Sequence, residues 1–600
     1  MQTAARQNPI PIPPILPRPL KAWADPFGSA LRKLLIPSNL LDSLEDARRT
    51  GTGMRFVQRL LDCLEIRFLV SVGDVKRIPA LGPAVLVANH PYGILDGLVL
   101  MAVLGRVRPD FKILANSWLR WIGELREYMI LVDPFETEAA SRENRAPLRD
   151  ALSVLTNGGL LAAFPAGEVA HIDWREQAVT DPAWKSTAVR LSLRTRSPVV
   201  PVFFEGANSL PFQVTGLLHP GLRTIGLARE FAKMRAKTVR LHIGSPVPHA
   251  TLAGYRDAGQ ATDYVRVRTF LLANRIGAAA PSDVAGRAIR ASESPANEQR
   301  FEEEVAALPA ECELAGDAKF SVYLAEAARI PTLLPEIGRC RELAFRSVGE
   351  GSGRHVDLDR FDEYYRHLFL WNRVDRRLAG AYRLAVTSDV IGRMGTAGLY
   401  TATLFRFHPE FFRRIGPALE LGRSFVMPEY QKNYAALLLL WKGITRTVLR
   451  RPEAPVLFGA VSISQGYSPV SRSLIASYLG GRAAHELGRM VTPRRKFRHP
   501  AMRDRQIQRM ASISPDIEDL SLSIADIEGD GKGMPVLIRQ YLKAGGRVLG
   551  LSVDPAFSNT LDALIMTDLR AAPLALLERC MGREEARAFR SAQHNQSDFQ

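Results

Sequence analysis

The chain has 600 residues, of which 79 are Lys or Arg and 62 are Asp or Glu, so its formal net charge is +17 at pH 7. This length is too great for a single hydrophobic core, and we expect two or three domains. The apolar fraction of 46% is ordinary for a folded globular protein, and the four cysteines lie too far apart for a zinc site or a disulfide framework, which predicts a reducing compartment and no structural metal.

The positive charge indicates an anionic partner, and by itself it leaves nucleic acid, an acidic protein and an anionic membrane open. Solubility is the plainer explanation for many of the exposed arginines. The sequence contains no aromatic and basic platform and no recognised nucleic-acid-binding motif. We therefore expect no nucleic acid partner.

Residues 1–25 are predicted to be an unstructured, proline-rich arm that includes NPIPIPPILPRPL. This arm lacks the charged and then apolar pattern of a signal peptide. No uninterrupted apolar run reaches the roughly 18 to 20 residues that span a bilayer, and the best candidate, from Leu81 to Leu104, is interrupted by His90, Pro91 and Asp96. We expect a cytoplasmic protein that lies on the inner face of the cell membrane without crossing it.

Residues 26–275 are predicted to form the first domain. Apolar and basic positions alternate at helical spacing over residues 27–72, which predicts two amphipathic helices, divided near Gly51 and Gly53, that either pack on the domain or dip into lipid. Short apolar runs then alternate with helical patterns, as in an α/β domain with a largely parallel sheet. The expected strands are AVLVAN (84–89), FKILAN (111–116), GLLAAFP (159–165), PVVPVFFEG (198–206) and TVRLHIG (238–244), and an expected helix is ENRAPLRDALSVLTN (143–157).

Residues 276–317 are rich in Ala, Ser, Pro and Glu and are interpreted as a linker that contains a short acidic helix. A second mixed α/β domain is predicted over residues 318–572, followed by a helix and a polar tail over 573–600. The expected strands are RLAGAYRLAV (377–386), GLYTATLF (398–405), ALELGRSFV (418–426), VLFGAVSIS (456–464), GRVLGLSV (546–553) and LIMTDL (564–569). Expected helices cover 435–450 and a segment with Pro535 at its first position that ends at Gly545 and Gly546.

A histidine and an aspartate follow the first expected strand. His90 is placed at the carboxyl end of a parallel strand, where such sheets bind ligands, and Asp96 stands at the start of the next helix. Asp96 can accept the Nδ1 proton of His90, which leaves the other ring nitrogen free to take a proton from an attacking hydroxyl. An isolated pair at this spacing is more often structural, so the surrounding residues decide its interpretation.

Three ordered blocks around this pair resemble the glycerolipid (lysophosphatidic-acid-type) acyltransferase family, over about residues 55–250. The blocks are Asn89-His90-Pro91-Tyr92-Gly93-Ile94-Leu95-Asp96, Phe164-Pro165-Ala166-Gly167-Glu168 and Val199-Val200-Pro201-Val202. The resemblance implies an α/β acyltransferase domain in which His90 and Asp96 are catalytic. It also implies a substrate site formed by Asn89, Gly93, Phe164, Pro165, Gly167, Glu168 and Pro201.

The departures from this family concern charge and spacing. Five residues rather than four separate His90 from Asp96, and Gly93 can absorb the extra one because glycine permits unusual dihedral angles. Two arginines of the family pattern are missing, one after Gly167, where Glu168 and Val169 stand, and one near Asp133. Because arginine binds phosphate bidentately, we infer an acceptor without a glycerol phosphate head group. Glu168 either binds a cationic acceptor or caps the following turn.

A second candidate site centres on the expected strand at 418–426. Glu420, Gly422 and Ser424 share one face of a regular strand and Arg423 lies on the other. A carboxylate in the middle of a sheet is costly unless it is used or paired, so Glu420 is the candidate base that deprotonates an ammonium, through water. Arg423 would orient substrate or carrier, which requires a β-bulge, or it forms a surface or interdomain ion pair.

The segments around this strand add further polar candidates. Asn433 is a good N-cap for the following helix, whose free amides form an anion site to which Lys432 adds charge. Ser468, before Pro469, is interpreted as a helix cap. Asp554 and Asp562 flank a turn and either hold a cationic amine or serve turn chemistry alone.

Residues 318–570 resemble the GNAT N-acyltransferase fold, and within it the ornithine-lipid N-acyltransferase and hemolysin-like branch. The resemblance is carried by Asp357–Asp362, Gly380–Arg383, Gly398–Thr401, Glu420–Phe425, Pro428–Tyr434, Gly459–Ser464 and Gly546–Gly550. The glycine-rich coenzyme A turn of the wider fold is absent, and Gln431-Lys432-Asn433-Tyr434 stands there instead. That departure is typical of the branch that takes acyl groups from acyl carrier protein.

The two halves together resemble the bifunctional ornithine lipid synthases. The resemblance implies that the C-terminal domain acts first and transfers a 3-hydroxyacyl group from acyl carrier protein to the α-amine of ornithine. The N-terminal domain then acylates the 3-hydroxyl of the lyso-lipid. An acyl carrier protein thioester is the implied co-substrate, no metal or other cofactor is expected, and the expected partners are the carrier protein, membrane surface lipids, ornithine and the lyso-lipid.

Two other functions remain open on the sequence. The acceptor is a lysophospholipid, glycine or glutamine instead of ornithine, or the protein is a non-catalytic, hemolysin-like membrane-binding protein. The second alternative predicts that His90→Ala leaves activity intact.

Overall fold

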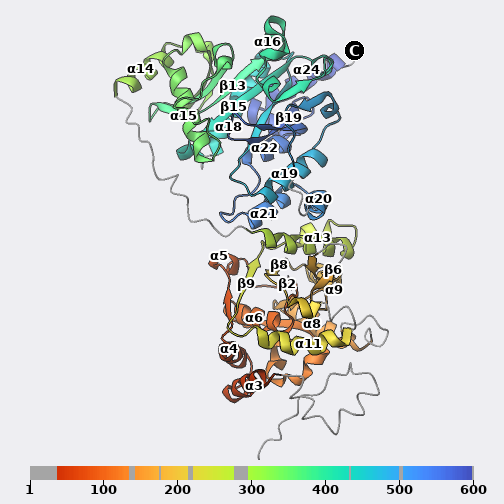
Figure 1. Cartoon of the computed structure of the whole chain (residues 1–600). Helices are drawn as coiled ribbons and strands as arrows, with labels where there is room; N and C mark the ends of the chain where they lie inside the picture. The colour runs from red at the N-terminus through yellow and green to blue at the C-terminus, as the bar shows by residue number, and fades with distance from the viewer. Residues whose placement is uncertain are drawn as a thin grey trace, which may run out of the picture. The chain divides into compact units, whose positions relative to one another are not determined.

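The computed structural model describes residues 37–133, 142–173, 178–213, 220–275, 295–431, 434–498 and 504–597. The chain divides into two compact units, Met1–Arg275 and Ile276–Gln600 (Figure 1). The proline-rich arm expected over residues 1–25 lies outside the described residues.

A seven-stranded sheet forms the middle of the first unit (Figure 1). Its strands, in spatial order, are β1 (Arg67–Leu69), β9 (Thr238–Ile243), β8 (Val199–Phe204), β2 (Ala84–Ala88), β5 (Leu160–Ala163), β3 (Phe111–Asn116) and β4 (Met129–Val132). The strands from β8 to β4 run parallel, β9 is antiparallel to β8, and β1 is parallel to β9. The largely parallel sheet predicted from the apolar runs is confirmed.

Helices cover both faces of this sheet. Alternate residues of β2, such as Leu86, join one core with α4 (Met54–Cys63), α6 (Ile94–Leu104) and α11 (Pro220–Lys233). On the other face α9 (Thr187–Thr195) lies against β2 and α13 (Ala258–Leu271) against β8, and α8 (Arg145–Thr156) packs beside α9. Such a two-layered cover is what a parallel sheet buried on both faces requires.

The two helices expected near the N-terminus are α3 (Ser38–Thr50) and α4, separated by Gly51 and Gly53, whose φ angles are +133° and +65°. Their apolar side chains belong to the same core as β2, including Leu40, Leu44, Phe56, Val57 and Leu60. Of the two alternatives for these helices, packing on the domain is therefore the one that the structure shows.

An eight-stranded sheet forms the middle of the second unit, antiparallel except for one parallel pair, β15 with β16. Its strands, in spatial order, are β10 (Glu313–Gly316), β11 (Phe320–Glu326), β12 (Arg366–Asn372), β13 (Arg377–Val386), β15 (Ala418–Val426), β16 (Val456–Ile463), β19 (Thr560–Asp568) and β18 (Arg547–Asp554). Helix α18 (Tyr434–Arg450) makes the crossover between β15 and β16, since parallel neighbours cannot be joined by a tight turn.

Three expectations for the second unit were wrong in detail. Residues 398–405, expected as a strand, form 3₁₀ turns ending with Tyr400–Thr403, and only Phe405–Phe407 is a strand, β14. Pro535 is the N-cap of α22 (Val536–Lys543) rather than its first residue. The C-terminal segment contains two helices, α23 (Leu574–Met581) and α24 (Arg583–Ser597), because Gly582 adopts φ +97° between them.

The linker expected over residues 276–317 is too long. Its acidic helix, α14 (Pro295–Ala306), places Phe301 and Val305 in a core of the second unit, and β10 already pairs with β11. Residues 276–294 lie outside the described residues. The acidic helix is therefore part of the second unit, because its apolar side chains need that core for burial.

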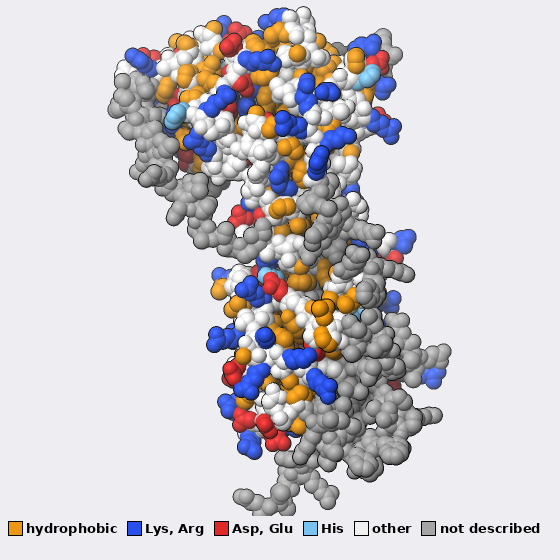
Figure 2. Space-filling model, viewed as in Figure 1, with side chains coloured by type: hydrophobic (Ala, Val, Ile, Leu, Met, Phe, Trp, Pro, Cys, Tyr) orange, Lys and Arg blue, Asp and Glu red, His pale blue; other side chains and the backbone are white. Residues whose placement is uncertain are grey.

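Charged side chains are spread over the visible face of both units, with Lys and Arg interspersed with Asp and Glu (Figure 2). Among the residues that the structure describes, no helix is long and apolar enough to span a bilayer.

Candidate active sites

His90 is the second residue after the end of β2 and is fixed from several sides. Its Nδ1 lies 3.0 Å from Oδ2 of Asp96, and its ring stacks on Phe164 with centroids 4.3 Å apart. Its backbone N–H donates to Asp181 (3.1 Å) and its carbonyl accepts from the N–H of Ala170 (2.9 Å). The side chain remains 18% exposed, so a fixed imidazole is presented to a ligand.

Asp96 stands in the first turn of α6 and is completely buried. Its Oδ2 accepts hydrogen bonds from His90 and from the backbone N–H groups of Tyr92 and Gly93 (2.9 and 3.0 Å), and Gly93 caps the helix with φ +79°. The turn between His90 and Asp96 therefore passes through a left-handed backbone conformation at Gly93, which favours glycine. Burial raises the pKa of Asp96, and the hydrogen bonds oppose this effect.

Asn89 and Pro201 are buried between strands. Oδ1 of Asn89 accepts from the N–H of Phe204 (2.7 Å) and its Nδ2 donates to the carbonyl of the same residue (3.0 Å), which fastens β2 to β8. Pro201 is paired in register with Val87 on β2. Both side chains lie where β2, which leads to His90, meets β8, and their predicted contact with substrate stays a prediction.

The segment after β5 runs past the histidine. Phe164 stacks on His90, the carbonyl of Pro165 accepts from the N–H of Lys185 (2.9 Å), and Gly167 adopts φ +71° while its N–H donates to Phe164. Glu168 is exposed two residues before Ala170, which bonds to the His90 carbonyl. An acidic side chain therefore stands near the His90 segment, and the next residue, Val169, occupies the place of the arginine in the family pattern.

Asp181 is a residue of this site that the sequence did not indicate. It is 2% exposed, and its carboxylate accepts from the backbone of His90 and from Nε1 of Trp184 (2.9 Å). Arg266 donates to its carbonyl (3.0 Å), and burial raises the pKa of its carboxyl. No spacing rule links residues 90 and 181, so only the folded chain reveals the contact.

In the second unit, β15 contains the bulge that the arrangement of Glu420 and Arg423 requires. Its register with β13 shifts between Ala381 and Arg383, and Arg423 adopts φ +49°. The bulge breaks the alternation of faces, so Arg423 lies on the same side as Glu420 while Ser424 lines a pocket on the opposite side. The regular alternation that grouped Ser424 with Glu420 is therefore wrong.

Glu420 is 1% exposed, and both of its carboxylate oxygens accept hydrogen bonds. One accepts from the hydroxyl of Tyr365 and the other from the N–H of Thr401 (2.7 Å), while the N–H of Tyr400 donates to the Tyr365 hydroxyl (2.9 Å). Burial raises the pKa of Glu420, and these hydrogen bonds oppose it. Tyr365 and the backbone of Thr401 thus occupy both oxygens of Glu420. A proton from a substrate would have to reach this carboxylate by way of the Tyr365 hydroxyl.

Arg423 belongs to a buried cluster of alternating charges. Its guanidinium lies over the rings of Tyr400 (5.1 Å) and Phe557 (4.8 Å) and within 3.5 to 3.7 Å of Asp359 and Asp357. The other ion pairs of the cluster join Arg383 to Asp359 (2.6 Å) and Asp362 (3.1 Å), and Arg341 to Asp357 (2.8 Å) and Asp362 (3.0 Å). Arg423 thus forms neither a surface nor an interdomain pair.

Three further carboxylates lie on the face of the sheet that carries Glu420. Glu350 accepts from the hydroxyl of Ser462 (2.6 Å), Asp562 is paired in register with Ser462, and Asp554 accepts from the N–H of Ala556 (2.9 Å). Burial and mutual repulsion raise the pKa of Asp562 to about 7, and burial raises that of Glu350 to about 7. The turn chemistry expected of Asp554 is confirmed, whereas Asp562 lies within β19.

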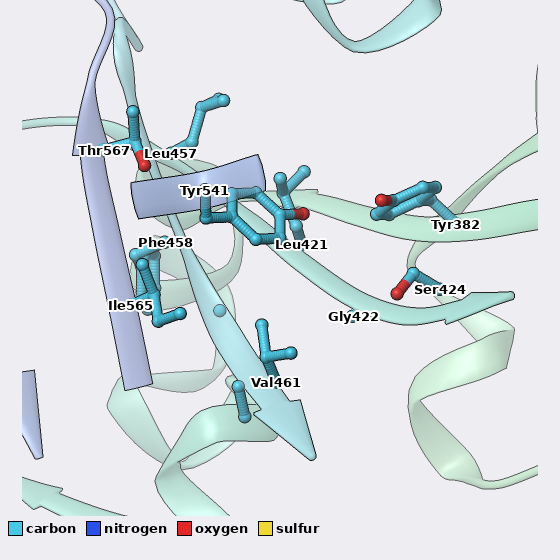
Figure 3. A pocket seen from close by; sticks show the side chains of 12 residues that line it. Tyr382, Leu421, Gly422, Ser424, Leu457, Phe458, Val461, Tyr541, Ile565 and Thr567 are labelled. Atoms are coloured by element: carbon cyan, nitrogen blue, oxygen red, sulfur yellow. The ribbon is translucent and has the colours of Figure 1, made fainter. Parts of the chain in front are cut away.

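A pocket opens on the opposite face, where β15 and β16 part. The two strands pair only over Ala418–Glu420 and Val456–Phe458. Beyond that point they diverge around a small pocket that is open on one side (Figure 3).

Some expected residues fall elsewhere. Lys432 and Asn433 lie outside the described residues, so their anion site stays a prediction. Ser468 is the N-cap of α19 (Pro469–Gly481) and accepts from the N–H of Ser471 (3.0 Å), which confirms its interpretation as a cap. Within the described part of the chain, no group of three or more His, Cys, Asp or Glu side chains is arranged to hold a metal ion.

Two protein families match the chain, one in each unit. Residues 58–279 match the family described as acyltransferase, and residues 340–442 match the family described as acetyltransferase (GNAT) domain. The first match contains the His90 site and the second contains Glu420 and Arg423.

Several curated proteins are similar to parts of the chain. A glycine N(alpha)-acyltransferase of Bacteroides thetaiotaomicron is 28% identical over 251 residues, 40% of this chain and 74% of that protein. A lyso-glycine lipid O-acyltransferase of Phocaeicola vulgatus is 27% identical over 245 residues, 40% of this chain and 84% of that protein. An L-ornithine N(alpha)-acyltransferase of Rhodobacter capsulatus is 29% identical over 275 residues, 44% of this chain and 92% of that protein.

Proposed function

Because the chain is an acyl-transferring enzyme that joins an acyltransferase domain to a GNAT domain, we propose that it makes an amino-acid lipid in two steps. The GNAT domain transfers a 3-hydroxyacyl group from acyl carrier protein to the α-amine of ornithine. The N-terminal domain then acylates the 3-hydroxyl of this lyso-lipid. The observation that carries the proposal is the presence, on one chain, of a His–Asp pair suited to O-acylation and a GNAT-type site suited to N-acylation.

The first site supports acyl transfer to a hydroxyl. Asp96 fixes Nδ1 of His90, and the ring is wedged against Phe164 but remains partly exposed. An imidazole held in this way can remove the proton from a hydroxyl as it attacks a thioester carbon, and return it to the leaving thiolate. The carboxylate of Asp96 compensates the positive charge that develops on the ring. Because the hydroxyl attacks the thioester directly, no enzyme-bound acyl intermediate is needed.

The charge of the first site supports an acceptor without a phosphate. Glu168 is exposed on the turn that runs past His90, and the block that ends at Asp133 contains no arginine. A phosphate would gain from a bidentate arginine and would be repelled by a carboxylate. A lyso-lipid with an amino-acid head group fits this environment better than a lysophosphatidate.

The second site supports a cationic acceptor. Glu350, Asp554 and Asp562 are buried on the face that carries Glu420, and they form no ion pair closer than 4 Å within the described residues. Buried carboxylates without a counter-ion favour a ligand that brings positive charge. Ornithine carries a second amino group and glycine does not, which favours ornithine over glycine although relatives with both names match the chain.

The test is lipid analysis by mass spectrometry in a bacterial host that makes no amino-acid lipids. The host expresses the intact chain, His90→Ala or Glu420→Gln, and thermal unfolding of each purified protein establishes that it is folded. We expect a diacylated ornithine lipid from the intact chain, the mono-acylated amide from His90→Ala, and neither species from Glu420→Gln.

Other outcomes of this experiment contradict particular parts of the proposal. A diacylated glycine or glutamine lipid would show that the acceptor is that amino acid instead of ornithine, and the two-step order would stand. A change in phosphatidate-type lipids alone would make the first domain a glycerolipid enzyme. Intact activity in folded His90→Ala would favour the hemolysin-like, membrane-binding alternative.

A further inference from the structure

The pocket between β15 and β16 has apolar walls and one polar corner. Its apolar walls come from Leu421, Leu457, Phe458, Val461 and Ile565. Its polar corner contains the hydroxyl groups of Tyr382 on β13, Ser424 on β15 and Tyr541 on α22. In Figure 3 the hydroxyls of Tyr382 and Tyr541 point toward each other, with Ser424 close to Tyr382.

The Tyr382 hydroxyl is buried without a hydrogen bond to any described residue. Tyr382 is 3% exposed, and the hydroxyls of Ser424 and Tyr541 are its polar neighbours, but neither meets it with hydrogen-bond geometry. Leaving a buried hydroxyl unpaired costs about 1 to 3 kcal/mol, and native proteins rarely leave one without a reason. Burial also raises the pKa of Tyr382, so the group stays protonated and can donate.

The bulge in β15 and Gly459 on β16 shape the gap beside this corner. The bulge turns Ser424 to the pocket side, while Gly459 allows the carbonyl of Leu421 to approach β16, because a Cβ at this glycine would lie 2.1 Å from that oxygen. A thioester in the gap would place its carbonyl near the strands and the first carbons of its chain in the pocket. A substituent on those carbons is the part of the donor nearest to the polar corner.

We propose that Tyr382, assisted by Ser424, recognises the 3-hydroxyl of the acyl donor and so makes the GNAT domain selective for 3-hydroxyacyl thioesters. This inference rests on the proposed N-acyl transfer and adds the residues that select the donor. It also links the two steps, because only an acyl chain that carries this hydroxyl can accept the second acyl group. The pocket would therefore exclude donors that yield a product with no site for O-acylation.

The test compares two donors with the full-length protein, ornithine as the acceptor, and Tyr382→Phe as the main variant. The donors are 3-hydroxypalmitoyl and palmitoyl thioesters of acyl carrier protein, and the measured quantity is kcat/KM for N-acylation with each. The wild type is expected to prefer the hydroxylated donor. Tyr382→Phe is expected to lower kcat/KM for that donor about ten- to hundredfold and to leave the palmitoyl value unchanged, because a site built to bond a hydroxyl discriminates through that bond.

Two further variants make the comparison decisive. Tyr478→Phe changes a buried tyrosine of α19 that does not line the pocket, and its donor ratio should equal that of the wild type. Ser424→Ala removes the neighbouring hydroxyl and should shift the ratio in the same direction as Tyr382→Phe, which keeps the proposal testable if the latter variant does not fold.

Each remaining outcome overturns a defined claim. Equal loss with both donors in Tyr382→Phe would show that the hydroxyl contacts the thioester or the carrier arm, and the inference would be wrong. An unchanged ratio in Tyr382→Phe, or a wild type that uses both donors equally, would overturn the inference and leave N-acylation of ornithine standing. No N-acylation with either donor would overturn the proposed function itself.

Discussion

Single side chains at the two sites illustrate what local sequence can and cannot reveal. His90, Gly93 and Asp96 lie within seven residues, so their hydrogen bond follows from a strand, a turn and a helix start that the sequence already indicates. Asp181 and Tyr365 contact their partners only through tertiary structure, 91 and 55 residues away. A contact of this kind has no spacing rule, which is why both residues were missed.

Asp562 gives a prediction about stability and pH. Its pKa is raised to about 7 by burial and by Asp554 and Glu350, whereas an unfolded aspartate has a pKa near 3.8. Between these two values the folded protein retains a proton that the unfolded chain has lost, so the free energy of unfolding falls as the pH rises through this window. Asp562→Asn removes that dependence, and from pH 4 to pH 7 its stability should improve relative to the wild type by roughly 2 to 4 kcal/mol.

Urea unfolding at several pH values between 4 and 8 measures this difference. The matched control is Asp568→Asn, on the same strand, where the carboxylate pairs with Arg570 (2.8 Å) and is partly exposed. This variant removes a carboxylate of the same strand that is not buried, so it tests whether the loss of any carboxylate from β19 produces the effect. A curve for Asp562→Asn that runs parallel to that of the wild type would mean that Asp562 is ionised in the folded protein throughout this range.

Among the secondary structure elements, the predictions succeeded where burial decides the pattern. The apolar runs that became β2, β5, β8 and β16 are buried along most of their length. Residues 398–405 contain Tyr, Thr and Phe, which favour strands, but local bonds such as that from the N–H of Leu404 to the carbonyl of Thr401 (3.1 Å) make 3₁₀ turns. Strand propensity was overridden there because the backbone N–H of Thr401 donates to Glu420 and that of Tyr400 donates to the Tyr365 hydroxyl.

Gly459 on β16 provides a test of the parting strands. In Gly459→Ala the added Cβ would lie 2.1 Å from the carbonyl oxygen of Leu421, which forces β15 and β16 apart. We expect a loss of about 2 to 4 kcal/mol of stability in the second unit and at least a hundredfold loss of N-acylation, with O-acylation of a supplied lyso-lipid retained. Thermal unfolding and separate assays of the two transfers measure these effects.

Gly480→Ala is the control for this substitution. Gly480 lies in α19, and a Cβ added there would meet no neighbouring atom of the described residues within 4 Å, so alanine should leave stability equal or slightly raised. Wild-type stability and activity in Gly459→Ala would mean that the strands have room to adapt and that their approach does not shape the pocket.

At the level of the whole molecule, the chain consists of two units with their own sheets and cores. Length and the change in composition after residue 275 predicted this division, but the acidic helix of the expected linker packs into the second unit. The low average hydrophobicity of this helix did not indicate that two of its side chains, Phe301 and Val305, are buried in a core of that unit. Composition describes an average, whereas burial depends on a few positions.

The proposed order of the two steps gives a prediction about complementation. Full-length His90→Ala and Glu420→Gln, expressed together in one cell, should restore the diacylated lipid that neither makes alone. The reason is that the mono-acylated intermediate is itself a lipid and can reach the second protein through the membrane. Mass spectrometry of lipids from the single and joint expressions measures this; if only the mono-acylated species appeared in the joint expression, the intermediate would have to be passed on within one chain.

The bulge in β15 also has a consequence for how such an enzyme can diversify. One extra residue directs Arg423 to one side of the sheet and its neighbour Ser424 to the other. Adjacent codons thus affect the two faces of the sheet separately, and under the proposed function a change in acyl chain preference need not disturb the choice of amino acid. Libraries that vary residues 422–426 can explore both specificities at once, provided that the number of residues in the strand is kept.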